Sequence, residues 1–118
     1  MLPESTQKLL RPAGYGGFEV DPNAVATHLS AFRLIDVRQP EEYNGPLAHI
    51  AGSELIPLAT VPDALASADR HRPLLMICRS GARSGNATAF LTQQGFETVV
   101  NLAGGMLAWN EAALPVER

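Results

Sequence analysis

The chain has 118 residues, of which 46% are hydrophobic and 18% are charged, so it can form one compact domain with its own core. Nine basic and twelve acidic residues give a net charge of −3, which excludes the strongly basic surface that non-specific binding to nucleic acid or anionic lipid requires. The longest apolar runs have about five residues, far fewer than the ~20 that span a bilayer, so we expect no membrane segment.

The first half of the chain begins with a segment of irregular composition. Residues 1–17 contain two prolines and three glycines, and we interpret them as a leader that drapes over the domain or frays. The domain itself is expected to span residues 18–118, where short apolar runs alternate with helical spacing. Strands are predicted at 17–20, 34–37 and 53–56. Helices are predicted from Asp21-Pro22 onward, as a single turn at 40–43, and over 58–68.

The second half centres on Leu74–Ile77, which is apolar at consecutive positions. Both faces of this strand should therefore be covered, as in the middle of a parallel sheet. A helix is predicted at 84–94, with Gly95 as its left-handed stop, followed by a strand at 98–101 and a helix at 106–110. Strands that alternate with helices over this length predict an α/β layer fold with a mostly parallel sheet.

The single cysteine, Cys78, lies between the strand at 74–77 and the helix that follows it. In open parallel sheets, ligands bind beyond the carboxyl ends of the strands, and Cys78 is predicted to lie there. The N–H groups of loop residues 79–83 could curl around the sulfur as an anion-binding nest, and the helix N-terminus would add partial positive charge. Gly81 permits a turn with positive φ, and Arg79 and Arg83 add two cations. These features favour the thiolate, the form of cysteine that attacks electrophiles.

The alternative is that Cys78 is only a small buried hydrophobic residue, as free cysteines often are. Its neighbours Arg79, Ser80 and Arg83 at a strand-to-helix junction favour the reactive interpretation. One cysteine excludes an internal disulfide, and with three scattered histidines it forms no ligand set typical of zinc. No nucleotide-binding fingerprint and no signal peptide are found, so we expect no metal, no cofactor and a reducing, cytoplasmic setting.

Four segments resemble, in the right order, the signatures of rhodanese-type sulfurtransferases. The segments are LIDVR at 34–38 with EEY at 41–43, HIAGS at 49–53, CRSGARS at 78–84, and NLAGGM at 101–106 with Trp109. The resemblance covers about residues 17–110 and implies a three-layer sandwich, with a mostly parallel central sheet of about five strands flanked by helices. Ala48 departs from the family, which often has glycine at this position.

The resemblance also implies a chemistry. The Cys78 thiolate would take a sulfane sulfur from a small anionic donor such as thiosulfate and pass it to cyanide or a thiol, in ping-pong covalent catalysis. Arg79 is expected to steer the donor, and Arg83 to brace the loop or the start of the helix. Asp36 and Ser84 would support the loop, Asp36 by hydrogen bonding. The full set expected to bind the substrate is Arg79, Ser80, Gly81, Ala82 and Arg83.

Two other functions stay open. The chain could be a persulfide carrier or regulatory binding module that exchanges sulfur with a protein partner and turns over small donors poorly. A small cysteine phosphatase is disfavoured, because four residues separate Cys78 from Arg83 whereas the similar loop of such phosphatases has five. The shorter loop suits a sulfur atom better than a tetrahedral phosphate.

The remaining conspicuous residues are given structural roles. Glu41 and Glu42 are expected to form a solvated helix start, with Arg38 paired to one of them and no function attached to the pair. Trp109 is expected to anchor the last helix in the core.

Overall fold

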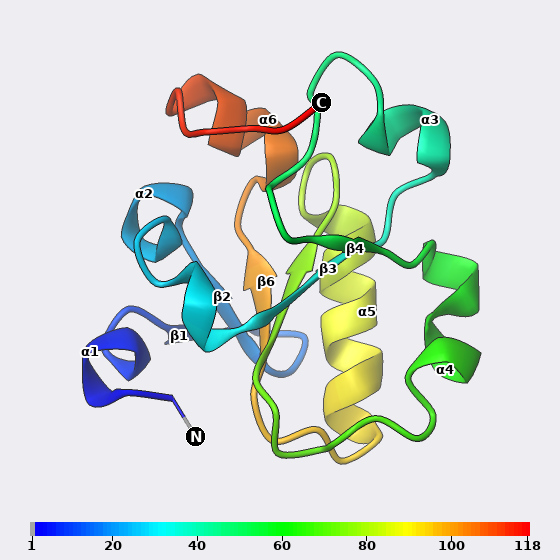
Figure 1. The fold of residues 1–118 in the computed structure, drawn as a ribbon. Coiled ribbons are helices and arrows are strands. Elements are labelled where there is room, and N and C mark those ends of the chain that lie inside the picture. The colour runs from blue at the N-terminus through cyan, green and yellow to red at the C-terminus, as the bar shows by residue number, and fades with distance from the viewer. Residues whose placement is uncertain (1) are drawn as a thin grey trace.

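The computed structural model of the protein describes residues 2–118. Six strands form one sheet in the order β1-β2-β6-β5-β3-β4 (Figure 1). Their bounds are β1 (Arg11–Pro12), β2 (Phe18–Val20), β3 (Arg33–Asp36), β4 (Glu54–Leu55), β5 (Leu74–Ile77) and β6 (Val99–Leu102). The β1–β2 pair is antiparallel and every other pair is parallel, which confirms the predicted α/β fold with a mostly parallel sheet.

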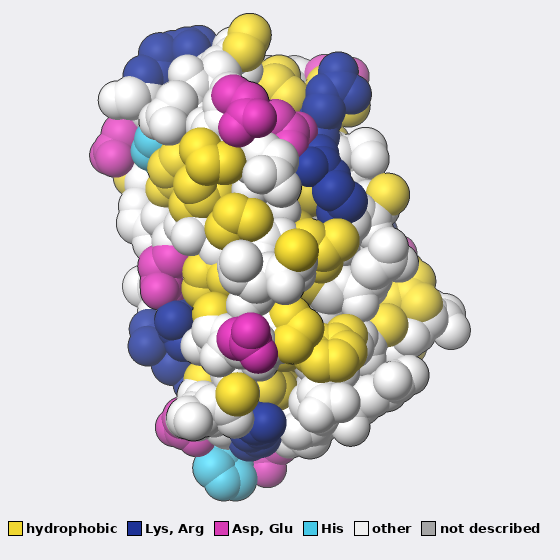
Figure 2. Space-filling view, turned by 90° about the vertical axis from the view of Figure 1, so that its right-hand side faces the viewer, with side chains coloured by type: hydrophobic (Ala, Val, Ile, Leu, Met, Phe, Trp, Pro, Cys, Tyr) yellow, Lys and Arg dark blue, Asp and Glu magenta, His cyan; other side chains and the backbone are white. Residues whose placement is uncertain are grey.

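Helices cover both faces of this sheet. They are α1 (Glu4–Gln7), α2 (Pro22–Val25), α3 (Pro40–Tyr43), α4 (Val61–Ala64), α5 (Ala82–Gln93) and α6 (Gly105–Glu111), with 3-10 turns η1 (Leu29–Ala31) and η2 (Leu58–Thr60). Figure 1 shows α1 and α2 on one side of the sheet and α4 and α5 on the other. Figure 2 shows the side of α4 and α5, where hydrophobic side chains make up much of the surface. No helix within residues 2–118 is long and apolar enough to cross a membrane.

The central strand β5 divides the core into two parts. Leu75 and Ile77 belong to the hydrophobic cluster on the α1, α2 and α6 face, which also holds Trp109. Leu74 and Met76 belong to the cluster under α4 and α5. Alternate residues of a strand point to opposite faces, so the uninterrupted apolar run arises because both faces are covered. Trp109 is 1% exposed and anchors α6 as predicted.

Two predicted helices are shorter than expected. The one over 58–68 divides into η2 and α4, because Pro62 lacks an N–H group and fits only the first turn of an α-helix. Its buried face is nevertheless as predicted, since Val61 and Leu65 are each 1% exposed. The helix that begins at Pro22 ends at Val25, and η1 follows it as a separate turn.

Residues 2–17 lie against the domain. Leu2 is buried in the core cluster on the α1 face, and Thr6 in α1 is 2% exposed. The two-residue strand β1 adds an edge to the sheet by pairing with β2, which accounts for six strands instead of about five. The segment ends in a turn closed by a 3.0 Å hydrogen bond from the Ala13 N–H to the Gly17 carbonyl.

Candidate active site

Cys78 lies immediately after β5, in the short connection to α5. The neighbouring strands β3 and β6 run parallel to β5, and their carboxyl ends carry Asp36 and Asn101. Parallel pairing therefore brings polar side chains from three strands to one edge of the sheet, which is where such sheets place their ligands.

Two donor groups lie within hydrogen-bonding distance of the Cys78 sulfur. The Gly81 N–H donates to Sγ at 3.1 Å, and the Ser84 hydroxyl oxygen lies 3.2 Å from it. Gly81 has φ +98°, which confirms the predicted positive-φ turn. Within residues 2–118, Gly81 supplies the one loop amide that bonds to Sγ, so the expected ring of several converging amides is not formed around this atom.

Cys78 is buried, with 1% of its surface exposed. Burial is also expected if Cys78 is only a hydrophobic core residue, so burial does not distinguish the two interpretations. The polar hydrogen bonds distinguish the two interpretations, because a cysteine that only fills space has no need of an N–H donor and a hydroxyl at its sulfur.

The start of α6 also reaches the reactive loop. The N–H groups of Met106 and Leu107 donate to the carbonyls of Cys78 (2.8 Å) and Arg79 (3.0 Å). A Cβ atom at Gly105 would lie 2.5 Å from both of these carbonyl oxygens, and Gly105 has φ +57°. A glycine is therefore needed for α6 to approach the loop this closely. The sequence interpretation assigned no such role to Gly105.

Arg83 is held by an acidic residue from a distant part of the chain. Its guanidinium donates two hydrogen bonds to the Glu42 carboxylate, at 2.6 Å and 2.7 Å. These bonds lower the pKa of Glu42 from 4.5 to about 2 and raise the pKa of Arg83. Glu42 thus connects α3 to the start of α5, and the expectation that it is merely solvated is wrong. Because its guanidinium is engaged, Arg83 is placed to brace the helix start.

Asp36 does not hydrogen-bond the loop directly. Among residues 2–118, its carboxylate bonds to Arg38, whose Nε and Nη2 atoms lie 2.9 Å and 2.8 Å from its two oxygens. Arg38 in turn donates to the carbonyls of Glu42 (3.2 Å) and Ala48 (2.7 Å). The expected direct support of the loop by Asp36 is therefore corrected: the carboxylate neutralises a buried arginine that orders the segment carrying Glu42. The expectation that Arg38 pairs with the carboxylate of Glu41 or Glu42 is also wrong, because its carboxylate partner is Asp36.

Arg79 is the loop cation that faces solvent. Arg79, Ser80 and Ala82 are exposed, and Arg79 forms no ion pair among the residues that the structure describes. A cavity of about 230 Å³ opens beside the loop. It is lined by Arg38, Glu42, Pro46, Leu47 and Arg79. An anion that enters here meets an exposed guanidinium next to the loop that holds the sulfur.

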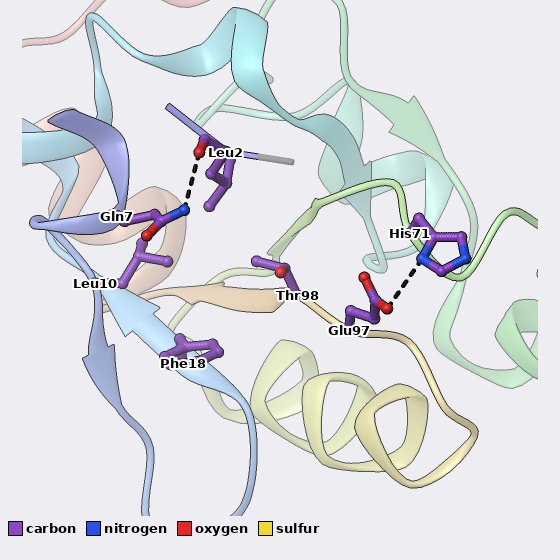
Figure 3. Close-up of a pocket in the computed structure, with 7 residues that line it drawn as sticks. All are labelled: Leu2, Gln7, Leu10, Phe18, His71, Glu97 and Thr98. Carbon is purple, nitrogen blue, oxygen red and sulfur yellow. Dashed lines mark hydrogen bonds and ion pairs between the residues drawn. The ribbon is translucent and has the colours of Figure 1, made fainter. Parts of the chain in front are cut away.

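A larger pocket, of about 470 Å³, lies at the other end of the strands. Figure 3 shows Phe18 at the start of β2 and Thr98 just before β6 on its wall, together with the ion pair between His71 and Glu97. Cys78 and Asn101 lie toward the opposite, carboxyl ends of their strands. This pocket is therefore separate from the sulfur and has no part in the candidate active site.

Known proteins resemble this chain in sequence and in fold. The sequence profile of the rhodanese-like domain family matches residues 21–112. A sulfurtransferase of Allochromatium vinosum is 34% identical over 101 residues, which are 83% of this chain and 92% of that protein. The thiosulfate sulfurtransferase GlpE of Pseudomonas paraeruginosa is 40% identical over 77 residues, covering 65% of this chain and 68% of its own.

Solved structures agree with these sequence matches. The crystal structure of a rhodanese-related protein from Thermoplasma volcanium superposes with a TM-score of 0.75 at 30% identity, over 84% of this chain and 96% of the other. The two proteins therefore share the fold of the sheet and its covering helices. With the profile covering most of its length and relatives of this similarity, the chain belongs to the rhodanese-like domain family.

Proposed function

We propose that the chain is a sulfurtransferase that moves a sulfane sulfur from thiosulfate, or a similar small anion, to a thiol or cyanide through a persulfide on Cys78. The observation that carries this proposal is the hydrogen bond from the Gly81 N–H to Sγ at the end of a central strand, where the Ser84 hydroxyl also lies within reach of the sulfur. The names of the similar proteins support transfer of sulfur as the class of reaction.

The first half-reaction loads the cysteine. The Cys78 thiolate attacks the outer sulfur of thiosulfate, so that a new S–S bond forms while the bond between the two sulfurs of thiosulfate breaks. Sulfite leaves with the electron pair of that bond, and a persulfide anion stays on Cys78. Charge is conserved, because one thiolate and one thiosulfate dianion become one persulfide anion and one sulfite dianion.

The second half-reaction unloads it. A nucleophilic acceptor attacks the outer sulfur of the persulfide, the bond to Sγ breaks, and the Cys78 thiolate is regenerated. This two-step exchange needs no group beyond the protein and its substrates. The burial of Cys78 supports it, because a persulfide at this depth is shielded from bulk water between the two half-reactions.

The loop residues are given distinct roles. Arg79 attracts the anionic donor, as the exposed cation beside the cavity of about 230 Å³. The main chain of Ser80, Gly81 and Ala82 borders the outer sulfur of the persulfide. Arg83, held by Glu42, keeps the start of α5 in place. Ser84 and Asp36 act as supporting residues, Asp36 through Arg38.

Partners and setting follow from the chemistry. The donor is a small anion, the acceptor is a thiol in the cell or cyanide in an assay, and a protein could serve as donor or acceptor. A reactive thiol persists in a reducing compartment, which supports a cytoplasmic location.

The experiment is a steady-state assay of thiosulfate with cyanide, comparing the wild type with Cys78→Ser. We expect thiocyanate formation by the wild type and none above background by the variant, which keeps the size of the side chain but lacks the sulfur nucleophile. Sulfur loading from a protein donor without turnover of thiosulfate would instead support the carrier function. Release of phosphate from an aryl phosphate without sulfur loading would support a phosphatase.

A further inference from the structure

A chain of polar groups connects the Cys78 sulfur to the surface. Ser84 Oγ lies 3.2 Å from Sγ and 2.5 Å from Oδ1 of Asn101. Asn101 is the polar residue of the otherwise apolar strand β6 and is 3% exposed. Its Nδ2 group donates to the Tyr15 hydroxyl at 2.9 Å. Tyr15 lies outside the family match at residues 21–112, in the segment that precedes β2.

The orientation of the Asn101 amide is determined by its partners. Nδ2 has two hydrogens and two acceptors, the Tyr15 hydroxyl and the Gly81 carbonyl, each at 2.9 Å. Oδ1 faces the Ser84 hydroxyl. Reversing the amide would set Oδ1 against the Gly81 carbonyl oxygen, where neither atom can donate. Oδ1 is therefore held toward Ser84.

The Ser84 hydroxyl has one hydrogen but two neighbouring acceptors, Sγ and Oδ1 of Asn101. When Cys78 is a thiol, the S–H group can donate to Ser84 Oγ while Ser84 donates to Asn101. When Cys78 is a thiolate, the sulfur needs the hydrogen that Asn101 holds. The two acceptors then compete for it.

The sulfur-loaded form removes this competition. In a persulfide, the negative charge is on the outer sulfur, and Sγ becomes a neutral bridging atom that accepts hydrogen bonds weakly. The Ser84 hydrogen can then stay on Asn101. The competition therefore acts against the thiolate and leaves the loaded form unaffected.

We propose that Asn101, held in place by Tyr15, is a positioning residue that withholds the Ser84 hydrogen from the Cys78 thiolate and so favours the loading of sulfur. This inference rests on the proposed sulfur transfer for its biological purpose. The competition for the Ser84 hydrogen itself involves only Cys78 without a bound sulfur. It assigns a role in the chemistry to two residues outside the reactive loop.

Charged groups near the loop set the background for the titration of the sulfur. Arg83 is close enough to interact electrostatically with Cys78 and Asp36. Arg38, Glu42 and Arg79 line the cavity beside the loop. The variants below change none of them. Differences between variants therefore report on the hydrogen bonds.

The test is a double-mutant cycle on the ionisation of Cys78, followed by the ultraviolet absorbance of the thiolate as a function of pH. The chain has one cysteine, so Cys78→Ser supplies the blank. In the wild-type background, where Asn101 holds the hydrogen, Ser84→Ala should raise the midpoint of the thiolate titration by about 0.3 of a pH unit or less. In the Asn101→Leu background, where Ser84 is free to donate, the same substitution should raise this midpoint by about one pH unit, which is the effect of a hydrogen bond to a charged group.

Equal shifts in the two backgrounds would overturn the proposal, because Ser84 would then donate equally to the thiolate whether or not Asn101 is present. If Asn101→Leu fails to fold by circular dichroism, Tyr15→Phe takes its place, since it removes one anchor of the amide. The Ser84→Ala shift must then be larger with Tyr15→Phe than in the wild type, and a shift that is not larger overturns the proposal. Tyr43→Phe is the matched control, because the Tyr43 hydroxyl bonds to the Ser53 carbonyl, away from this chain of groups. In the Tyr43→Phe background, the shift caused by Ser84→Ala must equal that in the wild type.

The titration contains no sulfur donor, so its result is independent of the proposed function. A failure of sulfur loading with a non-additive cycle would refute the sulfur transfer and leave the competition in place. Sulfur loading together with an additive cycle would support the sulfur transfer and refute the competition for the Ser84 hydrogen.

Discussion

The ion pair between Glu42 and Arg83 is the contact by which α3 holds the start of α5, the helix that follows Cys78. The substitution Glu42→Gln removes the negative charge of this pair. The glutamine has the same size and can still accept the 3.1 Å hydrogen bond that the Gln39 N–H donates to Glu42. The substitution therefore leaves the start of α3 capped and acts mainly on Arg83. We expect it to lower the free energy of unfolding at neutral pH.

The magnitude follows from the pKa of Glu42, which falls from 4.5 to about 2 in the folded protein. Such a shift corresponds to about 3 kcal/mol for a fully shielded pair. The side chains of Glu42 and Arg83 are 28% and 36% exposed, so solvent screening reduces the expected loss to about 1–2 kcal/mol. Because folding lowers this pKa, the contribution is complete above the unfolded value and is lost as the pH falls through about 2.

Urea unfolding followed by the fluorescence of Trp109, the single and buried tryptophan, measures both effects. The difference between the wild type and Glu42→Gln should shrink from about pH 5 toward about pH 2. Glu41→Gln is the control, since it removes an exposed carboxylate from the same helical turn. Equal stability of wild type and Glu42→Gln at neutral pH, or an equal loss with Glu41→Gln, would refute this account of the pair.

Three further predictions concern glycine, helix termination and the donor. Gly105→Ala should cost more than about 2 kcal/mol in urea unfolding, because its Cβ would overlap two carbonyls, whereas Gly52→Ala, with φ +84° and open space, should cost only about 1 kcal/mol; equal losses would contradict the overlap. Ala113→Gly should raise the free energy of unfolding by about 0.5–1 kcal/mol, and with it the melting temperature, because Ala113 has φ +56° just after α6. An unchanged or lower melting temperature would contradict this expectation. Arg79→Ala should raise KM for thiosulfate more than it lowers kcat, and a pure loss of kcat would exclude the steering role.

The sequence was informative where structure is local. The apolar run at Leu74–Ile77, the glycine turn at Gly81 and the placement of Cys78 at a strand end all follow from spacing and residue type, and all are present in the fold. Ala48 is a further example of a local signal, because it lies where the family often has glycine and its φ is +56°. A preference for glycine is the sequence signal of such a backbone conformation.

The parts that could not be predicted depend on residues far apart in the chain. Arg83 and Glu42 are separated by 41 positions, and Asn101 and Tyr15 by 86. No periodicity or local motif encodes such pairs, because the strand order brings them together. One signal was present: an asparagine near the carboxyl end of an apolar strand needs hydrogen-bond partners when buried, and this could have drawn attention to Asn101.

The length of the helices was also beyond local pattern. The spacing over 58–68 correctly placed Val61 and Leu65 in the core, but it did not show where the α-helix begins. Hydrophobic spacing describes which residues face the core, whereas proline and tertiary contacts decide how far a helix extends.

Intact mass spectrometry after incubation with thiosulfate tests the central claim most directly. The wild type should gain the mass of one sulfur atom, lose it again when cyanide is added, and show no gain when Cys78 is replaced by serine. A wild-type protein that stays unmodified, or a gain of sulfur that persists in Cys78→Ser, would contradict the assignment of Cys78 as the sulfur carrier.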